Sequence, residues 1–208
     1  MRAYKFLRAG RRAPFSNLVW PGNSWVTADG PLETCRSGIH ACRPVHLAYW
    51  LLPELWEIEL DGELLDSELM VVARRGRLAH RIDAWDDAVR RDLGEECVRR
   101  TARYAVLELR ELGLDREADL LEGARTVGEL AEAAVQVADT VRDGDAADLA
   151  AYVGDAHEYA QIGHVAGAAF IAAHAADLHS PVGVDDPFAA ERTEQSRWLA
   201  ERLELSGN

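Results

Sequence analysis

The sequence predicts an α+β protein, with a small, mostly antiparallel sheet module over residues 1–84 and an all-α helical bundle over 85–208. Two observations support this. The first part has short segments rich in aromatic and β-branched residues, interrupted by Pro and Gly, whereas apolar residues in the second part recur at helical spacing. The 208 residues suffice for one large or two small domains with a buried core.

Alternating side chains and turn residues predict the elements of the sheet module. A helix is expected at 44–52, because Pro is favoured at the first helical position, and Pro53 ends it. Turns are expected at Asp61-Gly62 and at Arg75-Gly76. The predicted strands are 4–8, 24–27, 37–42, 55–60, 69–73 and 77–82.

Helical periodicity predicts the elements of the second part. Gly113 ends the first helix, and Thr126 with Glu129 forms a capping box that begins the next one. A break is expected at Asp143-Gly144-Asp145 and a loop at 180–187. The predicted helices are 86–112, 126–141, 146–178 and 188–203.

Charge and composition exclude several classes of function. The chain has 23 basic and 36 acidic side chains, and residues 85–208 alone hold 12 basic against 26 acidic ones, a net charge of −14. Such a surface repels phosphate backbones and anionic membranes, so neither nucleic acid nor a membrane is expected as a partner. No apolar run approaches the roughly 20 residues of a membrane span, and no signal peptide is visible.

These features predict a cytoplasmic protein. Only one of the 23 basic residues is Lys, which is typical of a GC-rich, bacterial genome. Three cysteines, an odd number, argue against a disulfide framework.

Two segments of the first part resemble a known family. Residues 35–42 read Cys-Arg-Ser-Gly-Ile-His-Ala-Cys, and residues 55–63 read Leu-Trp-Glu-Ile-Glu-Leu-Asp-Gly-Glu. They resemble an uncharacterised domain of phage and bacterial proteins, often found near pentapeptide-type repeats, with a Gly-aromatic-His-Ala-Cys segment and a Glu-Val-Glu-Leu-x-Gly-Glu strand. The resemblance covers the first third of the chain, and Ile39 stands where an aromatic residue is common. No function is assigned to that family, so the resemblance implies none for this chain.

The same stretch is similar to the core of ADP-ribosyltransferase-like folds, in which a Gly-x-His or Gly-x-Tyr strand precedes a helix and a strand. That resemblance implies contacts with a nicotinamide nucleotide, and catalysis, by Arg8, His40 and Glu57 or Glu59. Glu57 and Glu59 share one face of their predicted strand, because side chains alternate with period two. The alternative is two exposed carboxylates without a function.

Four side chains with ligand-like chemistry lie close together in the sequence: Cys35, His40, Cys42 and His46. A metal site formed by them is geometrically possible, but their spacing matches no standard zinc finger or ribbon. Cys42 is instead a candidate nucleophile with His40 as its base, since both fall on one face of the predicted strand. The structural alternative is a His40 that donates to a buried carbonyl group beside an apolar Cys42.

A second constellation lies in the predicted helix 146–178. At 100° per residue, His157, Gln161 and His164 share one stripe. Buried polar groups need partners, so we expect a metal held by His157 and His164, a ligand bound near Gln161, or a satisfied polar seam within the bundle. The spacing is not the His-Glu-x-x-His pattern of zinc proteases.

Three functional hypotheses follow, and no cofactor is assigned. In the first, the sheet module binds a small ligand near His40, with Trp20 and Trp25 of the long loop contacting a planar group. In the second, the protein is an enzyme, either nucleotide-using or metal-assisted through the His157–His164 helix. In the third, the acidic bundle surface serves a structural interaction, including a homo-oligomer.

Overall fold

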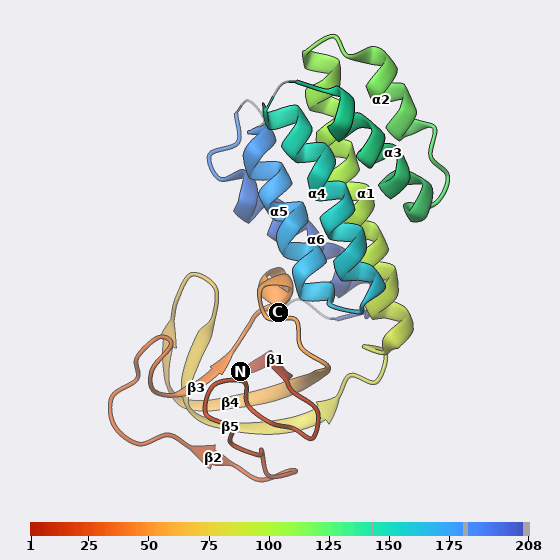
Figure 1. The fold of residues 1–208 in the computed structure, drawn as a ribbon. Coiled ribbons are helices and arrows are strands. Elements are labelled where there is room, and N and C mark those ends of the chain that lie inside the picture. The colour runs from red at the N-terminus through yellow and green to blue at the C-terminus, as the bar shows by residue number, and fades with distance from the viewer. Residues whose placement is uncertain (143, 181–182, 206–208) are drawn as a thin grey trace. The chain divides into compact units, whose positions relative to one another are not determined.

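A computed structural model describes residues 1–142, 144–180 and 183–205 and confirms the α+β class: an antiparallel five-stranded sheet precedes the helices (Figure 1). The chain divides into two compact units. Unit 1 comprises Met1–Asp86 and Ser196–Asn208, and unit 2 comprises Asp87–Gln195. The last helix, α6 (Pro187–Arg202), therefore contributes residues to both units, a division that the sequence does not predict.

Unit 1 is built on the long antiparallel pair β4 and β5, which lie side by side in Figure 1. The sheet order is β1-β4-β5-β2, and β3 also pairs with β5. A 3₁₀ helix at Pro44–Tyr49 replaces the predicted helix 44–52. The strands are β1 (Arg2–Leu7), β2 (Val26–Thr27), β3 (Ile39–Ala41), β4 (Glu54–Asp66) and β5 (Val71–Arg81).

Both predicted turns of the sheet module are wrong, because each Gly serves a role within a strand. Gly62 has a φ of +79° and lies where the β4–β5 register shifts, so it forms a bulge rather than a turn. A Cβ atom on Gly76 would lie 2.5 Å from Ile39 Cγ2, so Gly is required for close packing. The chain turns instead at Ser67, whose N–H donates to Met70 O at 3.0 Å.

Unit 2 packs its helices around the long α1, which contacts α2, α3, α4 and α5. Small residues allow a close approach: a Cβ atom on Gly94 would lie 3.1 Å from Ala160 Cβ. The predicted capping box is present at Thr126 and Glu129. The helices are α1 (Asp87–Glu111), α2 (Asp115–Glu122), α3 (Val127–Thr140), α4 (Gly144–Gln161) and α5 (Val165–His179).

The single long helix predicted at 146–178 is wrong, because the chain turns at Gly163. Gly163 has a φ of +72° and its N–H donates to Ala160 O, while the His164 N–H donates to Tyr159 O at 2.8 Å. These two bonds form a Schellman motif, which ends α4 and satisfies its last carbonyl groups. The apolar periodicity continues across this turn and conceals it.

Two predicted connections fall partly outside the described residues: the break at 143–145, which includes residue 143, and the loop at 180–187, which includes residues 181–182. Among the described residues, no helix combines the length and the apolar character needed to cross a membrane.

Gly38 provides a test of the packing in unit 1. Its φ is +123°, and a Cβ atom there would lie 2.2 Å from Val72 Cγ1. We expect Gly38→Ala to destabilise unit 1 by about 2–4 kcal/mol, since backbone strain and overpacking add. All six tryptophans lie in unit 1, so urea unfolding followed by tryptophan fluorescence reports on this unit.

The control is Gly10→Ala, which also has a positive φ, +76°, but has open space around the added methyl group. It should cost only the backbone term of about 1–2 kcal/mol. Equal losses for the two variants would contradict the role assigned to Val72.

Candidate functional site

The His40 ring is held by its own loop. Its Nε2 atom accepts a hydrogen bond from the Cys35 N–H at 3.1 Å, and Nδ1 lies 3.0 Å from Gly38 O. With Nδ1 protonated, one nitrogen donates and the other accepts, so both are engaged. Burial, together with the nearby Lys5 charge, lowers the pKa of His40. This arrangement matches the structural alternative and leaves no free nitrogen to act as a base.

The thiol of Cys42 is buried, at 2% exposure. Burial raises its pKa to about 12, so the thiolate that a nucleophile or metal ligand needs is scarce near neutral pH. Its charged neighbour is Lys5, which donates to His40 O at 2.5 Å and whose ammonium lies 5.3 Å from the centre of the Trp20 ring. The structure therefore speaks against a Cys42–His40 catalytic pair.

The residues implied by the ADP-ribosyltransferase resemblance lie apart. Glu59 pairs with Arg2 at one end of the β1–β4 ladder, and Arg8 follows the other end. Six residues separate Arg2 from Arg8, which corresponds to about 20 Å along an extended strand. His40 pairs with Val72, five residues along β5 from the partner of Glu59, or about 16 Å. Arg8, His40 and Glu59 are thus spread along the sheet, and nucleotide binding by the implied residues stays a prediction.

The prediction that Trp20 contacts a ligand is wrong, because Trp20 is a core residue. It is 2% exposed and packs in the apolar core of unit 1 with Leu7 and Ile58. A side chain so enclosed offers no surface to a ligand.

Trp25, by contrast, is 36% exposed and lines an open concavity in unit 1 with a volume of about 520 Å³. This Trp25 concavity brings together two of the sequence candidates, Trp25 and Glu59. Its lining consists of Met1, Arg2, Trp25, Glu59, Leu60 and Asp61.

Two arginines of β5 border the indole ring. The guanidinium carbons of Arg75 and Arg77 lie 4.7 and 5.1 Å from the centre of the Trp25 ring, within the range of cation–π attraction. Arg77 also donates to Glu59, and Arg75 lies 3.5 Å from Asp61.

Glu57, another candidate from the sequence, contacts Arg2, which lines the Trp25 concavity. It lies 3.5 Å from Arg2 and 3.9 Å from His80. Glu57 and Glu59 pair with Tyr4 and Arg2 in the β1–β4 ladder, two positions apart, which places both carboxylates on one face of β4 as expected.

The histidines of the helical bundle do not form the expected stripe, because α4 ends between them. His157 Nε2 lies 2.8 Å from Gln161 Nε2. His164 precedes α5, and its ring lies 5.2 Å from the Tyr159 ring, a contact that accompanies the Schellman turn. In the described part of the chain, no group of three or more His, Cys, Asp or Glu side chains is arranged to hold a metal ion. Metal binding at His157 and His164 stays a prediction. Among the described residues, no third side chain completes a metal site with them.

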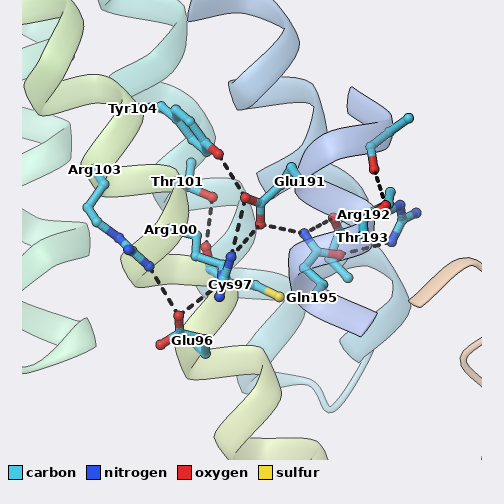
Figure 2. Close-up of polar contacts among 12 residues, drawn as sticks. Glu96, Cys97, Arg100, Thr101, Arg103, Tyr104, Glu191, Arg192, Thr193 and Gln195 are labelled. Carbon is cyan, nitrogen blue, oxygen red and sulfur yellow. Dashed lines mark hydrogen bonds and ion pairs between the residues drawn. The ribbon is translucent and has the colours of Figure 1, made fainter. Parts of the chain in front are cut away.

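A buried polar network in unit 2, missed by the sequence analysis, connects α1 with α6 (Figure 2). The Glu191 side chain, only 2% exposed, accepts from Tyr104 Oη at 2.7 Å and from Gln195 Nε2 at 3.0 Å. Arg100 Nη1 lies 3.4 Å from both Glu191 oxygens, and its Nε donates to Glu96 at 2.8 Å.

The electrostatics of this network are those of a structural element. Burial lowers the pKa of Arg100, but Glu191 and Glu96 outweigh that effect and raise it overall. Burial and the Glu191 charge raise the pKa of Tyr104. Every carboxylate oxygen of Glu191 has a partner, so the network fixes the α1–α6 contact and presents no reactive group.

Three comparisons, with protein-family models, with curated proteins and with solved structures, found no match to this chain. The roles of these residues therefore follow from their geometry alone.

Lys5, the only lysine of the chain, gives a pH test of unit 1. Burial lowers its pKa from 10.5 to about 8. Between these values the unfolded chain holds a proton that the folded unit has released, so Lys5 makes stability rise with pH across pH 8–10.5. The quantity to measure is the difference in the free energy of unfolding between the wild type and Lys5→Met. This difference should rise by about 1–3 kcal/mol from pH 7 to pH 10.5. Urea titrations followed by tryptophan fluorescence measure it, and a difference independent of pH would show a solvated ammonium.

Glu191→Ala tests the network of unit 2. It removes the acceptor shared by Tyr104, Gln195 and Arg100, of which Arg100 keeps its ion pair with Glu96, and should destabilise the helical unit by about 1–3 kcal/mol. Glu132→Ala, at an exposed position of α3, should change stability by less than about 0.5 kcal/mol. Urea unfolding followed by circular dichroism at 222 nm measures both, and comparable losses would contradict the importance of the network.

Proposed function

We propose that unit 1 is a small-molecule-binding module whose ligand, a planar ring carrying a carboxylate or phosphate group, binds in the Trp25 concavity. The observation that carries this proposal is the partly exposed indole ring of Trp25, which lines an open hollow and is bordered by the guanidinium groups of Arg75 and Arg77. A volume of about 520 Å³ lies within the range of small-molecule sites. The location differs from the predicted one near His40.

The hydrogen-bonding groups around Trp25 favour an acceptor-rich ligand. Each guanidinium has five N–H donors, and Arg75 and Arg77 use few of them on Asp61 and Glu59. A carboxylate or phosphate supplies the acceptors that these donors lack.

The planar part of the ligand is inferred from Trp25. Stacking on an indole ring is worth about 1–3 kcal/mol for a nucleobase. An enzymatic role has less support, because the His40 ring is engaged on both nitrogens and Cys42 is buried.

Two planar anions, AMP and 2-naphthoate, test the proposal by isothermal titration of the full chain. We expect saturable binding, weakened about tenfold by Trp25→Ala through the loss of stacking. The control is Phe15→Ala, which removes another exposed aromatic ring of unit 1, 89% exposed and outside the concavity. Inorganic phosphate and adenosine, the separate halves of AMP, should each bind more weakly than AMP.

The absence of saturable binding for both anions would overturn the proposal. Binding that Trp25→Ala leaves unchanged would also overturn it, because the ligand would then occupy another place.

A further inference from the structure

Unit 2 contains a second concavity, the α1–α3 groove, formed by one side of α1 and the segment from the end of α2 to the start of α3. Its volume is about 340 Å³. The buried side chains of Ala102, Leu121 and Leu130 form an apolar floor, and Leu107, which is 48% exposed, stands at its side. Such a floor binds apolar groups by removing them from water.

The rim of this groove carries positive charge in an otherwise acidic unit. Unit 2 has 10 arginines and no lysine against 23 acidic residues, a net charge of −13. Three of the ten arginines, Arg99, Arg103 and Arg125, line the groove. The acidic residue that lines it, Glu122, is engaged by Arg110 at 2.7 Å.

Arg125 is the arginine best placed to receive a ligand. Arg99 and Arg103 make ion pairs with Glu95 and Glu96, at 3.0 and 3.1 Å. The Arg125 side chain is exposed and, among the described residues, makes no ion pair and no hydrogen bond. A free guanidinium next to an apolar floor is complementary to a molecule with one anionic end and one apolar end.

We propose that the α1–α3 groove binds a small amphipathic carboxylate, with its anionic end on Arg125 and its aliphatic chain over the floor formed by Ala102, Leu121 and Leu130. A small molecule is the occupant because a volume of about 340 Å³ lies at the lower end of the range of small-molecule sites. The site is independent of the Trp25 concavity, which lies in the other unit.

The first test is isothermal titration of the full chain with decanoate at low ionic strength. We expect one saturable site, with octanoate binding about threefold to tenfold more weakly because two methylene groups are lost. Decan-1-ol, which lacks the charge, should also bind more weakly than decanoate. A lack of saturable decanoate binding would overturn the proposal.

Two pairs of variants locate the site. Arg125→Gln should weaken decanoate binding about threefold to fivefold, the usual scale of an exposed ion pair, whereas Arg116→Gln, an exposed arginine of α2 outside the groove, should have no effect. Leu107→Glu should weaken binding more than tenfold through repulsion and lost apolar area. Its control is Leu120→Glu, at an exposed leucine of α2 outside the groove.

Circular dichroism of all four variants checks their folding. If Arg125→Gln and Leu107→Glu bind decanoate as their controls do, decanoate binds elsewhere and the assignment is wrong. AMP binding should be unchanged in every one of these variants, so failure here is distinguishable from failure of the Trp25 concavity.

Discussion

The register of β4 against β5 is the constraint on which the Trp25 concavity depends. It places Glu59 opposite Arg77 and Asp61 opposite Arg75, and β2 joins the same ladder through Val26, the residue after Trp25. Because side chains alternate, a slip of one residue would turn these groups to the other face of the sheet. The core prevents such a slip, since Ile39 packs where a side chain on Gly76 would stand. The concavity is thus a consequence of core packing on the opposite side of the strand.

Burial alone does not identify a binding site in this protein. The Glu191 network is the most enclosed polar group of unit 2, but each carboxylate oxygen of Glu191 already accepts a hydrogen bond. Breaking a satisfied buried pair is costly, so a ligand would gain little by entering. Arg125 differs because its guanidinium group keeps its N–H donors unused beside an accessible hollow, and Arg77, next to the Trp25 ring, has donors beyond the one that it gives to Glu59. Unused donors next to open space, rather than depth, distinguish the two proposed sites.

Local signals made the helices, the capping box and the carboxylate face of β4 predictable from the sequence. Thr126 and Glu129 are three residues apart and act within one turn, and alternation places Glu57 with Glu59. Two of the failures involve distant partners. Arg77, which binds Glu59, comes from another strand 18 residues away, and Gly76 looks like a turn residue unless the approach of Ile39 is known. The turn at Gly163 is missed for a local reason, because the apolar spacing continues through it. The signal that could have revealed it is a Gly between two helical patterns.

The distribution of charge explains how an acidic chain can offer the two anion sites proposed above. Unit 1 has 13 basic and 13 acidic residues, so the net charge of −13 resides in unit 2. Exposed charges are screened beyond a Debye length of about 8 Å at physiological ionic strength, and the immediate surroundings of a site then outweigh the total. Except for the half-buried Lys5, every basic side chain is an arginine. Arginine binds carboxylates and phosphates through a planar fork of donors, and it keeps donors available after making one ion pair. A lysine at position 77 would neutralise Glu59 as well, but it would place a single ammonium beside Trp25 instead of a planar guanidinium with N–H groups to spare.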